Sequence, residues 1–474
     1  MSVMLKVFQL HVSVATLFGM IADGLLCFFA IVLAASSVHI LPGSHEASAG
    51  LTVPHLFLFA SGFAMVMSLL YAFAGLYRPT PIGFAAMLRR TLAALVVGAY
   101  VTYLVLDSIA NGGYAVQIMT SAVLYLLVGL VLVRGAMYLM SRMATIPKVL
   151  IVGNGAEAQS VASDLMTMKR LRRNVAGFFP TEADAASGLQ VASLRGHKVF
   201  SRELSIEDIV RDHHIDEVIV AVREQRGGGV PMDQLLACRI RGVPIVDLAG
   251  FYERAKSEVP IDSLKASWLV YGQGFVQGRL RMILKRAFDI ASSSFLLLLA
   301  SPVMLLAMLA IRLEGRGPII YKQERVGLGG AIFMCMKFRS MRTDAEKDGV
   351  AVWATKNDSR VTRVGAFMRK TRIDELPQLL SVLRGEMSMV GPRPERPSFV
   401  KQLKEQIPFY DVRHSIKPGV TGWAQVRYSY GASVDDARRK HQFDLYYVKN
   451  NSLMLDLLVL IETVSVVLFR EGAH

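Results

Sequence analysis

Cysteine is scarce in this chain, with 3 residues among 474, and charged residues make up only 19%. Cys27, Cys238 and Cys335 lie far apart, which excludes a disulfide framework and a cysteine-based zinc site and fits a reducing compartment. Soluble chains carry about 25% charged and about 45–50% apolar residues. The hydrophobic share here is 53%, so the composition excludes both a disordered chain and a purely soluble enzyme.

Acidic residues are also in short supply, with 38 Asp+Glu against 53 Lys+Arg, and the resulting net charge of +15 is unevenly spread. Residues 1–150 carry a net +4, residues 151–278 carry −1, and residues 279–474 carry +12. The positive field of the last segment indicates a polyanionic partner, which can be anionic lipid headgroups, a phosphorylated substrate or nucleic acid.

Long apolar runs, in contrast, are abundant in the first 145 residues. Each of four runs is long enough to cross a bilayer core of about 30 Å as a helix: Val12–Ser36, Leu51–Tyr77, Met87–Leu106 and Tyr114–Met140. The loops 37–50 and 107–113 contain no Lys or Arg, whereas the loop 78–90 contains three. Because positive loops stay in the cytoplasm, both ends of this block are expected there.

The next segment, residues 146–256, alternates strand-like and helix-like stretches. The strands expected near 149–152, 175–179, 217–222 and 244–246 predict a parallel α/β sheet. The spacing Gly153-x-Gly155-x-x-Ala158 after the first strand has the form of a dinucleotide-binding loop, but the same glycines can simply make the turn. Tyr252-x-x-x-Lys256 has the spacing of a short-chain dehydrogenase pair, for which chance is the favoured reading.

After a linker at 257–278, an apolar run at 287–313 is flanked by cations at both ends, Lys285-Arg286 and Arg312 among them. Ser301-Pro302 lies near its middle, and an interior proline bends a helix. Positive flanks on both sides disfavour a simple crossing. We therefore expect a helix at about 283–313 that enters one leaflet and returns; a fifth, kinked transmembrane helix is the alternative.

Adjacent carboxylates, Asp374-Glu375, lie in a segment rich in arginine and lysine. The dyad is expected at the N-terminus of a helix over 375–383, with Pro377 in its first turn. Neighbouring carboxylates repel unless a cation sits beside them, and Mg²⁺ both relieves this repulsion and grips phosphate oxygens. A carboxylate can also attack a phosphoryl group, which makes Asp374 and Glu375 candidate catalytic and metal-binding residues.

Residues 279–474 resemble the monotopic phosphoglycosyl transferases, also called bacterial sugar transferases. Six motifs in order carry the resemblance: Lys285-Arg286 with Asp289, Ser301-Pro302, Lys337-Phe338-Arg339-Ser340-Met341, Asp374-Glu375-Leu376-Pro377-Gln378, Pro392-Arg393-Pro394 and Pro418-Gly419-x-Thr421-Gly422-Trp423-Ala424-Gln425. The C-terminal run from Tyr430 to Phe469 is similar to members associated with exosortase-type exopolysaccharide loci. Arg427 stands near the place where many members carry an Asn-Gly-Arg motif.

The resemblance implies a reaction: transfer of a sugar 1-phosphate from a UDP-sugar to undecaprenyl phosphate, with release of UMP. It implies Asp374 as the nucleophile of a phosphosugar-aspartyl intermediate and Glu375 as its helper, with Mg²⁺ on the dyad. Four cations, Lys337, Arg339, Arg369 and Arg393, are the candidate ligands of phosphate or nucleotide. Lys285, Arg286, Ser301 and Pro302 are implied to serve the re-entrant helix and its lipid surroundings.

The expected fold is a membrane protein of α plus α/β class. It has a four-helix transmembrane bundle (1–145), a Rossmann-like, CoA-binding-like domain (146–256), and a monotopic catalytic domain (279–474) with the re-entrant helix. Its expected place is the bacterial inner membrane as a multi-pass protein, with the catalytic domain in the cytoplasm. The expected partners are undecaprenyl phosphate, a UDP-sugar and membrane lipids, and no nucleic acid; a homodimer, the sugar and the role of the middle domain are left open.

Two other functions remain as alternatives at this point. The first is a membrane-anchored, NAD-dependent nucleotide-sugar dehydratase or epimerase that uses the middle domain. The second is a non-catalytic scaffold that binds the lipid carrier. The incomplete glycine motif counts against the first, and Asp374-Glu375 among so many cations counts against the second.

Overall fold

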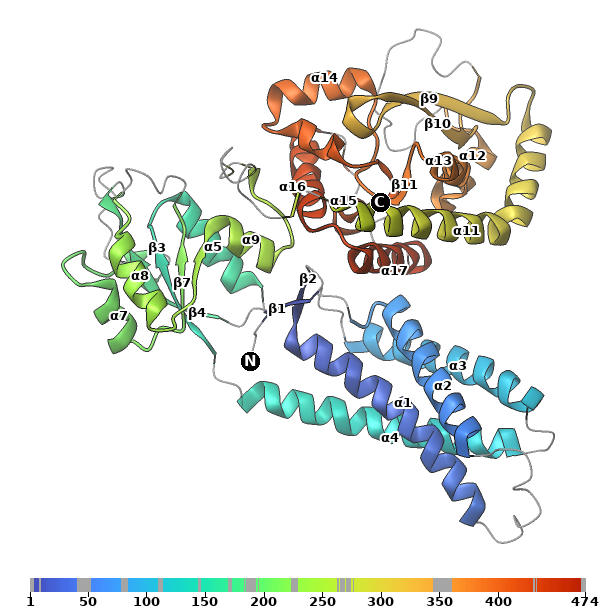
Figure 1. Ribbon diagram of the computed structural model, residues 1–474, viewed down its shortest axis with the longest axis horizontal. Coiled ribbons are helices and arrows are strands. Elements are labelled where there is room, and N and C mark those ends of the chain that lie inside the picture. The colour runs from blue at the N-terminus through green and yellow to red at the C-terminus, as the bar shows by residue number, and fades with distance from the viewer. Residues whose placement is uncertain are drawn as a thin grey trace. The chain divides into compact units, whose positions relative to one another are not determined.

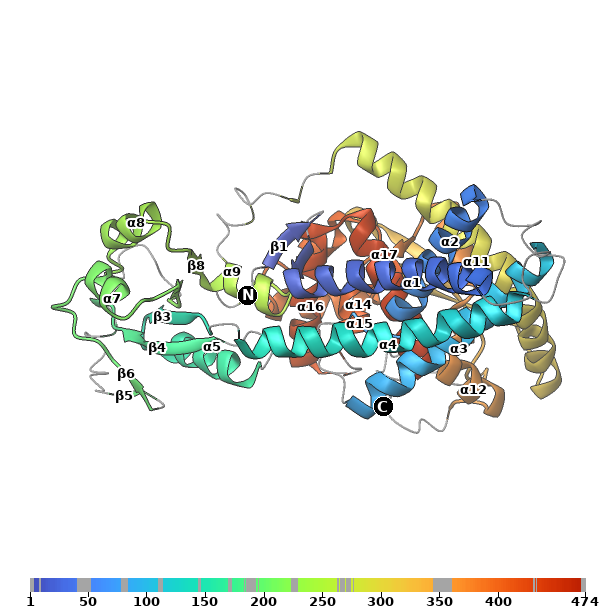
Figure 2. The same cartoon turned by 90° about the horizontal axis from the view of Figure 1, so that it is seen from below.

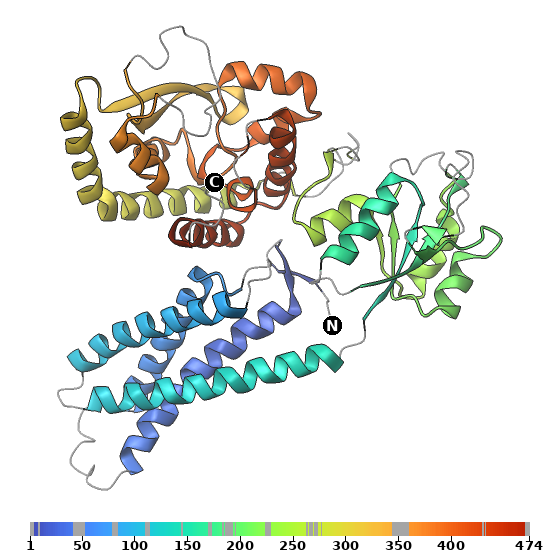
Figure 3. The same cartoon turned by 180° about the vertical axis from the view of Figure 1, so that it is seen from behind.

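The structure is a computed structural model, and three of its views are given in Figures 1, 2 and 3. It describes residues 4–7, 10–40, 53–77, 84–109, 114–143, 146–168, 173–182, 184, 193–194, 196–222, 229–261, 264, 269, 274–275, 277–343, 360–428, 431 and 433–469. The chain divides into two compact units, one that includes residues 11–251 and one that includes residues 252–474.

Four apolar helices follow a short hairpin of β1 (Met4–Val7) and β2 (Leu10–Ser13). They are α1 (Val14–Ile40), α2 (Val53–Phe73), α3 (Phe84–Ile109) and α4 (Tyr114–Met143). Each contains a stretch long and apolar enough to cross a membrane: Thr16–Ser37, Pro54–Phe73, Ala85–Ser108 and Val116–Ala136. The four predicted runs are therefore confirmed as helices of spanning length.

These helices share one buried core, and α1 runs alongside α4 (Figures 2 and 3). Small residues allow close approach: a Cβ on Gly129 of α4 would come within 2.6 Å of a methyl carbon of Leu26 in α1. Asp23 of α1 is fully buried and accepts hydrogen bonds from Arg134 of α4 (2.7 Å) and from Tyr77, beyond the end of α2 (3.1 Å). This buried polar cluster ties three segments together.

The middle segment holds a four-stranded parallel sheet in the order β4-β3-β7-β8. Its strands are β3 (Lys148–Val152), β4 (Asn174–Phe179), β7 (Glu217–Val220) and β8 (Ile245–Asp247), which confirms the four predicted strands. The helices of this segment are α5 (Ala156–Thr167), α7 (Ile206–Asp212) and α8 (Met232–Ile240), which lie between strands in the chain, and α9 (Leu248–Ala255), which follows β8. A small hairpin pairs β5 (Ser193–Leu194) with β6 (His197–Lys198).

The C-terminal unit is built around α11 (Arg279–Glu314), which is a fifth helix of spanning length and composition. Figures 1 and 3 show α11 as two arms that meet at a bend. Pro302 has no N–H to give to the carbonyl of Leu298, and the Ser301 hydroxyl donates to that carbonyl instead (2.8 Å). The bend that the interior proline predicts in this helix is thus confirmed.

Two small sheets and a set of helices complete this unit. The strands β9 (Ile320–Val326) and β10 (Ile332–Phe338) are antiparallel, and β11 (Ser388–Val390) is parallel to β12 (Gly419–Thr421). The helical elements are η2 (Leu328–Gly330), α12 (Arg363–Thr371), η3 (Ile373–Glu375), α13 (Gln378–Arg384), α14 (Pro397–Gln406), η4 (Tyr410–Ser415), α15 (Trp423–Arg427), α16 (Val434–Asn450) and α17 (Leu453–Phe469).

A buried apolar cluster connects α11 to the elements that carry the carboxylates. Ala307 and Ile311 of α11 pack with Phe338 of β10 and Met368 of α12, and Ile373 and Leu376 border the same cluster. Burial of this apolar surface fixes the turn between α12 and α13 against α11. The turn that carries the carboxylate pair therefore packs against α11, the helix of spanning length.

Candidate active site

Asp374 and Glu375 lie in η3, a single 3-10 turn between two helices. The preceding Arg372 has a left-handed backbone conformation (φ 60°), which ends α12 and redirects the chain. Pro377 is the N-cap of α13, so that helix begins at Gln378. The sequence predicted the dyad at the N-terminus of this helix, and that prediction is wrong: the left-handed Arg372 places the dyad in a separate turn before α13.

Glu375 is held by cations from two other elements. Its Oε1 lies 2.9 Å from Nζ of Lys337, on β10, and 2.8 Å from a guanidinium nitrogen of Arg393, in the turn after β11. Its Oε2 lies 4.0 Å from Arg372. Burial alone would raise the pKa of Glu375, but the charges of Arg393, Lys337 and Arg372 outweigh it and hold the pKa well below its usual value. Glu375 is therefore a fixed negative charge.

Asp374 has the opposite character. Its side chain is buried, and its Oδ1 has no hydrogen-bond partner among the described residues. Burial and the neighbouring charge of Glu375 raise its pKa, and Lys337, Arg369 and Arg393 only partly offset this. A buried carboxylate oxygen without a donor is costly. Asp374 is therefore the member of the pair with an oxygen available to a cation or an electrophile.

The four candidate phosphate ligands are not all at the dyad. Lys337 and Arg393 bind Glu375 directly, and Arg369 acts on Asp374 through its charge while its Nε donates to the Ser340 hydroxyl (2.9 Å). Arg339 instead donates to carbonyls of Ile311, Gly315 and Arg316 at the C-terminal end of α11 (2.8–3.1 Å). The structure thus gives Arg339 the contacts of a helix-end cap.

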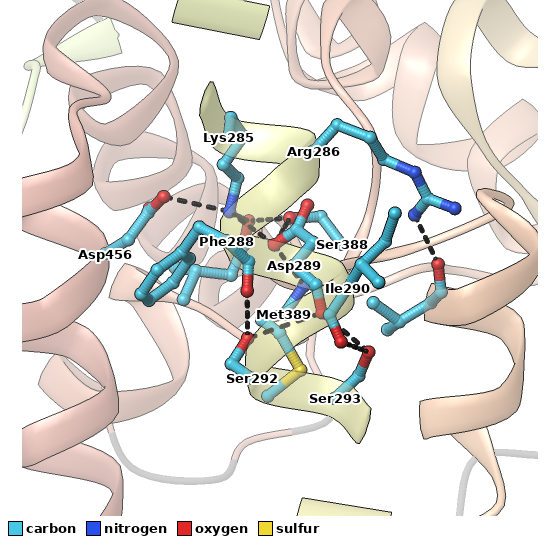
Figure 4. Close-up of polar contacts among 12 residues, drawn as sticks. Lys285, Arg286, Phe288, Asp289, Ile290, Ser292, Ser293, Ser388, Met389 and Asp456 are labelled. Atoms are coloured by element: carbon cyan, nitrogen blue, oxygen red, sulfur yellow. Dashed lines mark hydrogen bonds and ion pairs between the residues drawn. The ribbon is translucent and has the colours of Figure 1, made fainter. Parts of the chain in front are cut away.

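Lys285 and Arg286 attach the first part of α11 to the C-terminal unit that carries the dyad (Figure 4). Lys285 lies 3.0 Å from Asp289 and 2.8 Å from Asp456 of α17. Asp289 also accepts hydrogen bonds from the hydroxyl of Ser388 and the N–H of Met389, both at 3.1 Å.

Arg286 donates to two carbonyls at the end of α13, those of Val382 (2.6 Å) and Leu383 (2.7 Å). Both ends of α11 are therefore bound to one domain. The sequence placed Asp289 in a motif, but nothing in the sequence indicated that it shares Lys285 with Asp456.

A magnesium ion would have to rely on few protein ligands here. Within the described part of the chain, no group of three or more His, Cys, Asp or Glu side chains could hold a metal ion. Mg²⁺ is often bound by one or two carboxylates together with substrate phosphates, and the unpartnered Oδ1 of Asp374 fits such a site. Glu375 fits less well, because its Oε1 already binds Lys337 and Arg393.

A side chain of the protein itself, Asp184, binds the glycine loop of the middle domain. Gly153 has a φ of 111° and lies where a Cβ would be 2.9 Å from the carbonyl oxygen of Ala221, so the turn requires glycine. The carboxylate of Asp184 accepts hydrogen bonds from the N–H of Asn154 (3.1 Å) and from the N–H (2.9 Å) and hydroxyl (2.8 Å) of Thr181. A protein carboxylate thus uses a loop N–H that a dinucleotide phosphate would need. In the dehydrogenase-like pair, Nζ of Lys256 lies over the ring of Tyr252, 5.0 Å from its centre; Tyr252 is on the short helix α9, and Lys256 directly follows it.

Comparison with known proteins gives a consistent result. Residues 280–470 match the family described as bacterial sugar transferase. The chain is 40% identical over 259 residues to the UDP-N-acetylgalactosamine-undecaprenyl-phosphate N-acetylgalactosaminephosphotransferase of Aeromonas hydrophila, covering 55% of this chain and 60% of that protein. It is 36% identical over 334 residues to the undecaprenyl-phosphate glucose phosphotransferase of Komagataeibacter xylinus, covering 69% of this chain and 60% of that protein.

A third relative is matched over more of its length. The chain is 32% identical over 346 residues to the undecaprenyl-phosphate galactose phosphotransferase of Salmonella typhimurium, with 69% of each chain covered. The match to the first two relatives spans 60% of their length. The carboxylate dyad and the cations around it all lie within residues 280–470, which match the family. The chain therefore belongs to the bacterial sugar transferase family.

Proposed function

We propose that this protein transfers a sugar 1-phosphate from a UDP-sugar to undecaprenyl phosphate, as an early membrane step of exopolysaccharide synthesis. The carrying observation is the asymmetry of the dyad: Glu375 is neutralised by two cations, while Asp374 keeps a buried oxygen without a hydrogen-bond donor. Three relatives bear names with undecaprenyl phosphate as acceptor and three different sugars. The acceptor is thus the shared chemistry, and the sugar is what varies.

The proposed reaction has two displacements at one phosphorus. A carboxylate oxygen of Asp374 attacks the β-phosphorus of the UDP-sugar; the new bond joins Asp374 to phosphorus, and UMP leaves with the electron pair of the broken P–O bond. A phosphate oxygen of undecaprenyl phosphate then attacks the same phosphorus, and the bond to Asp374 breaks. The carboxylate is regenerated and undecaprenyl-diphosphate-sugar is formed.

The surrounding cations act on the charge of this reaction. Lys337 and Arg393 neutralise Glu375, and together with Arg369 they lower the cost of a second negative charge on Asp374. Fixed cations also stabilise the charge that moves to the phosphoryl oxygens and the leaving group. Mg²⁺, bound through Asp374 and the substrate phosphates, would supply further charge neutralisation.

The contacts at the ends of α11 support a re-entrant membrane position. Near its start, Arg281 donates to Asn451, and near its end, Arg339 caps the carbonyls of Gly315 and Arg316. Because one globular domain holds both ends, we propose that both lie on the cytoplasmic side of the inner membrane. Between them, large apolar side chains are exposed, including Phe295 (65%), Leu298 (77%) and Leu306 (66%), which suits lipid contact.

The decisive experiment measures UMP release by the purified protein with undecaprenyl phosphate and a panel of UDP-sugars. We expect release with at least one sugar, loss of release in excess chelator, and recovery with Mg²⁺. Absence of UMP with every sugar tested would contradict the proposal. Protein that turns over in excess chelator would contradict only the metal.

The membrane position is tested separately. Single cysteines near residues 279 and 316, in a background without native cysteine, should both resist an impermeant thiol reagent applied to intact cells. Labelling near residue 316 would show that α11 crosses the membrane.

A further inference from the structure

Behind the turn that carries Arg393 lies an almost fully buried arginine, Arg413 of η4. It is 5% exposed, and its guanidinium binds three groups. It lies 2.8 Å from the carboxylate of Asp444, on α16, and donates to the hydroxyl of Tyr410 (2.6 Å) and to the main-chain carbonyl of Arg393 (2.9 Å). Its charge also lies over the ring of Tyr410, at 5.0 Å.

Removing a guanidinium from water is costly unless charge and hydrogen bonds compensate for it. Asp444, itself 2% exposed, supplies the opposite charge. Arginine also offers several donors in a rigid planar fork, so a single side chain can bind a carboxylate and a carbonyl in fixed directions. This pair therefore links α16 to the main chain at Arg393 and fixes the distance between them.

The turn itself has little means of holding this position alone. In Pro392-Arg393-Pro394, two of three residues lack an N–H donor. Its neighbours are fixed from outside: the N–H of Gly391 donates to Thr421 (2.9 Å), and Arg325 donates to the carbonyl of Pro394 (3.0 Å). Arg413 binds the carbonyl between these points, on the residue whose side chain reaches Glu375.

We propose that Arg413, fixed by Asp444, is a positioning residue that sets the main chain of Arg393 and so the contact between Arg393 and Glu375. This role rests on the proposed transfer reaction, because it assigns Glu375 a part in it. Sequence reasoning missed both residues, since an arginine and an aspartate 31 positions apart carry no local pattern.

The test compares the full-length parent with Arg413→Lys and Asp444→Asn. Lysine retains a charge for Asp444 but lacks the fork that binds the Arg393 carbonyl at the same time. We expect kcat to fall about 10–100-fold, as for other residues that orient catalytic groups, with KM for the UDP-sugar changed less than about threefold. Glu253→Gln is the matched control, because it breaks another buried ion pair to α16, with Lys449, which lies five positions after Asp444 and is not among the groups that bind Arg413.

A double-variant cycle separates positioning from a general loss of structure. If Arg413 acts through Arg393, Arg413→Lys should cost much less in an Arg393→Lys background than in the parent. Equal losses in the two backgrounds would overturn the proposal.

Amide hydrogen exchange gives a readout that does not depend on turnover. Peptides covering residues 388–396 should exchange faster in Arg413→Lys and Asp444→Asn than in the parent. In Glu253→Gln they should exchange at the rate of the parent. Unchanged exchange in those peptides would refute the positioning role even if activity fell. A parent protein that releases no UMP would instead defeat the transfer reaction, and exchange would still decide whether Arg413 holds the turn.

Discussion

Two aspartates, the half-buried Asp184 and the buried Asp374, have opposite surroundings. Asp184, in the middle domain, receives three hydrogen bonds from the main chain and from Thr181. Asp374, in the catalytic domain, has an oxygen with no hydrogen-bond partner among the described residues and a raised pKa caused by burial and by Glu375. The first carboxylate accepts hydrogen bonds from the loop around it, whereas one oxygen of the second accepts none from the described residues.

This difference supports the proposed site at Asp374 more directly than the motifs do. The glycine loop has the form of a cofactor site, but Asp184 already binds one of its N–H groups. The dyad consists of only two carboxylates, but cations from β10, from α12 and from the turn after β11 surround it. A site for a ligand is shown by unsatisfied groups and converging charge.

The largest expected difference between the two aspartates is in turnover. Asp374→Asn keeps the shape of the side chain but removes the charge and the nucleophile, so UMP release should fall by about a thousandfold or more. Asp184→Asn should leave kcat within about twofold of the parent. Substantial activity in folded Asp374→Asn protein would refute the nucleophile assignment, and equal losses in both variants would remove the contrast.

A second prediction concerns the pH dependence that Lys337 gives to Asp374. The lysine charge lowers the pKa of Asp374 against the raising effects of burial and Glu375. In Lys337→Gln, the pKa of Asp374 should therefore rise further, the ionised fraction at a given pH should fall, and the acid limb of kcat should move to higher pH. We expect kcat at its optimum to drop about 10²-fold, since a fixed cation near the developing charge is lost.

The control for this prediction lies on the neighbouring strand. Lys322, on β9, is exposed, and Lys322→Gln should leave the pH profile unchanged. A limb that stays in place in Lys337→Gln, or moves to lower pH, would contradict the assigned electrostatics.

Sequence patterns predicted the helices, the parallel strands, the bend at Pro302 and the carboxylate pair, because each depends on neighbours in the chain. They did not predict which cations reach the pair. Lys337 and Arg339 are two positions apart on and after β10, but one binds Glu375 and the other caps α11. Such choices depend on distant segments that are brought together by packing.

The same limit applies to the start of the catalytic unit, which gives a third prediction. Residues 257–278 read as a linker, but the Trp423 indole N–H donates to the carbonyl of Ser257 (2.9 Å), and Glu258, 1% exposed, pairs with Arg439 (2.7 Å). A chain that begins at residue 252 should retain transfer in detergent. One that begins at residue 267 should be less stable by about 2–4 kcal/mol, because it loses a buried hydrogen bond and two ion pairs, Glu258–Arg439 and Glu253–Lys449.

Thermal unfolding and UMP release of the two shortened proteins check this directly. Equal melting temperatures would show that residues 252–266 contribute nothing to the fold of the unit. Loss of activity in a stable protein that begins at residue 252 would show that the preceding domains take part in the reaction.

The smallest effect on activity is expected from the loop of the middle domain. Asp184→Ala leaves the N–H groups of Asn154 and Thr181 without their acceptor, which should cost about 1–3 kcal/mol of stability in that domain. Hydrogen exchange in peptides covering residues 150–157 should accelerate, while kcat stays within about twofold of the parent. Asp212→Ala is the control, because Asp212 is exposed and pairs only with the exposed Arg211 among the described ion pairs. If Asp184→Ala instead abolished transfer in a protein whose catalytic domain kept its exchange pattern, the middle domain would be coupled to the dyad, and the contrast between the two aspartates would be one of degree.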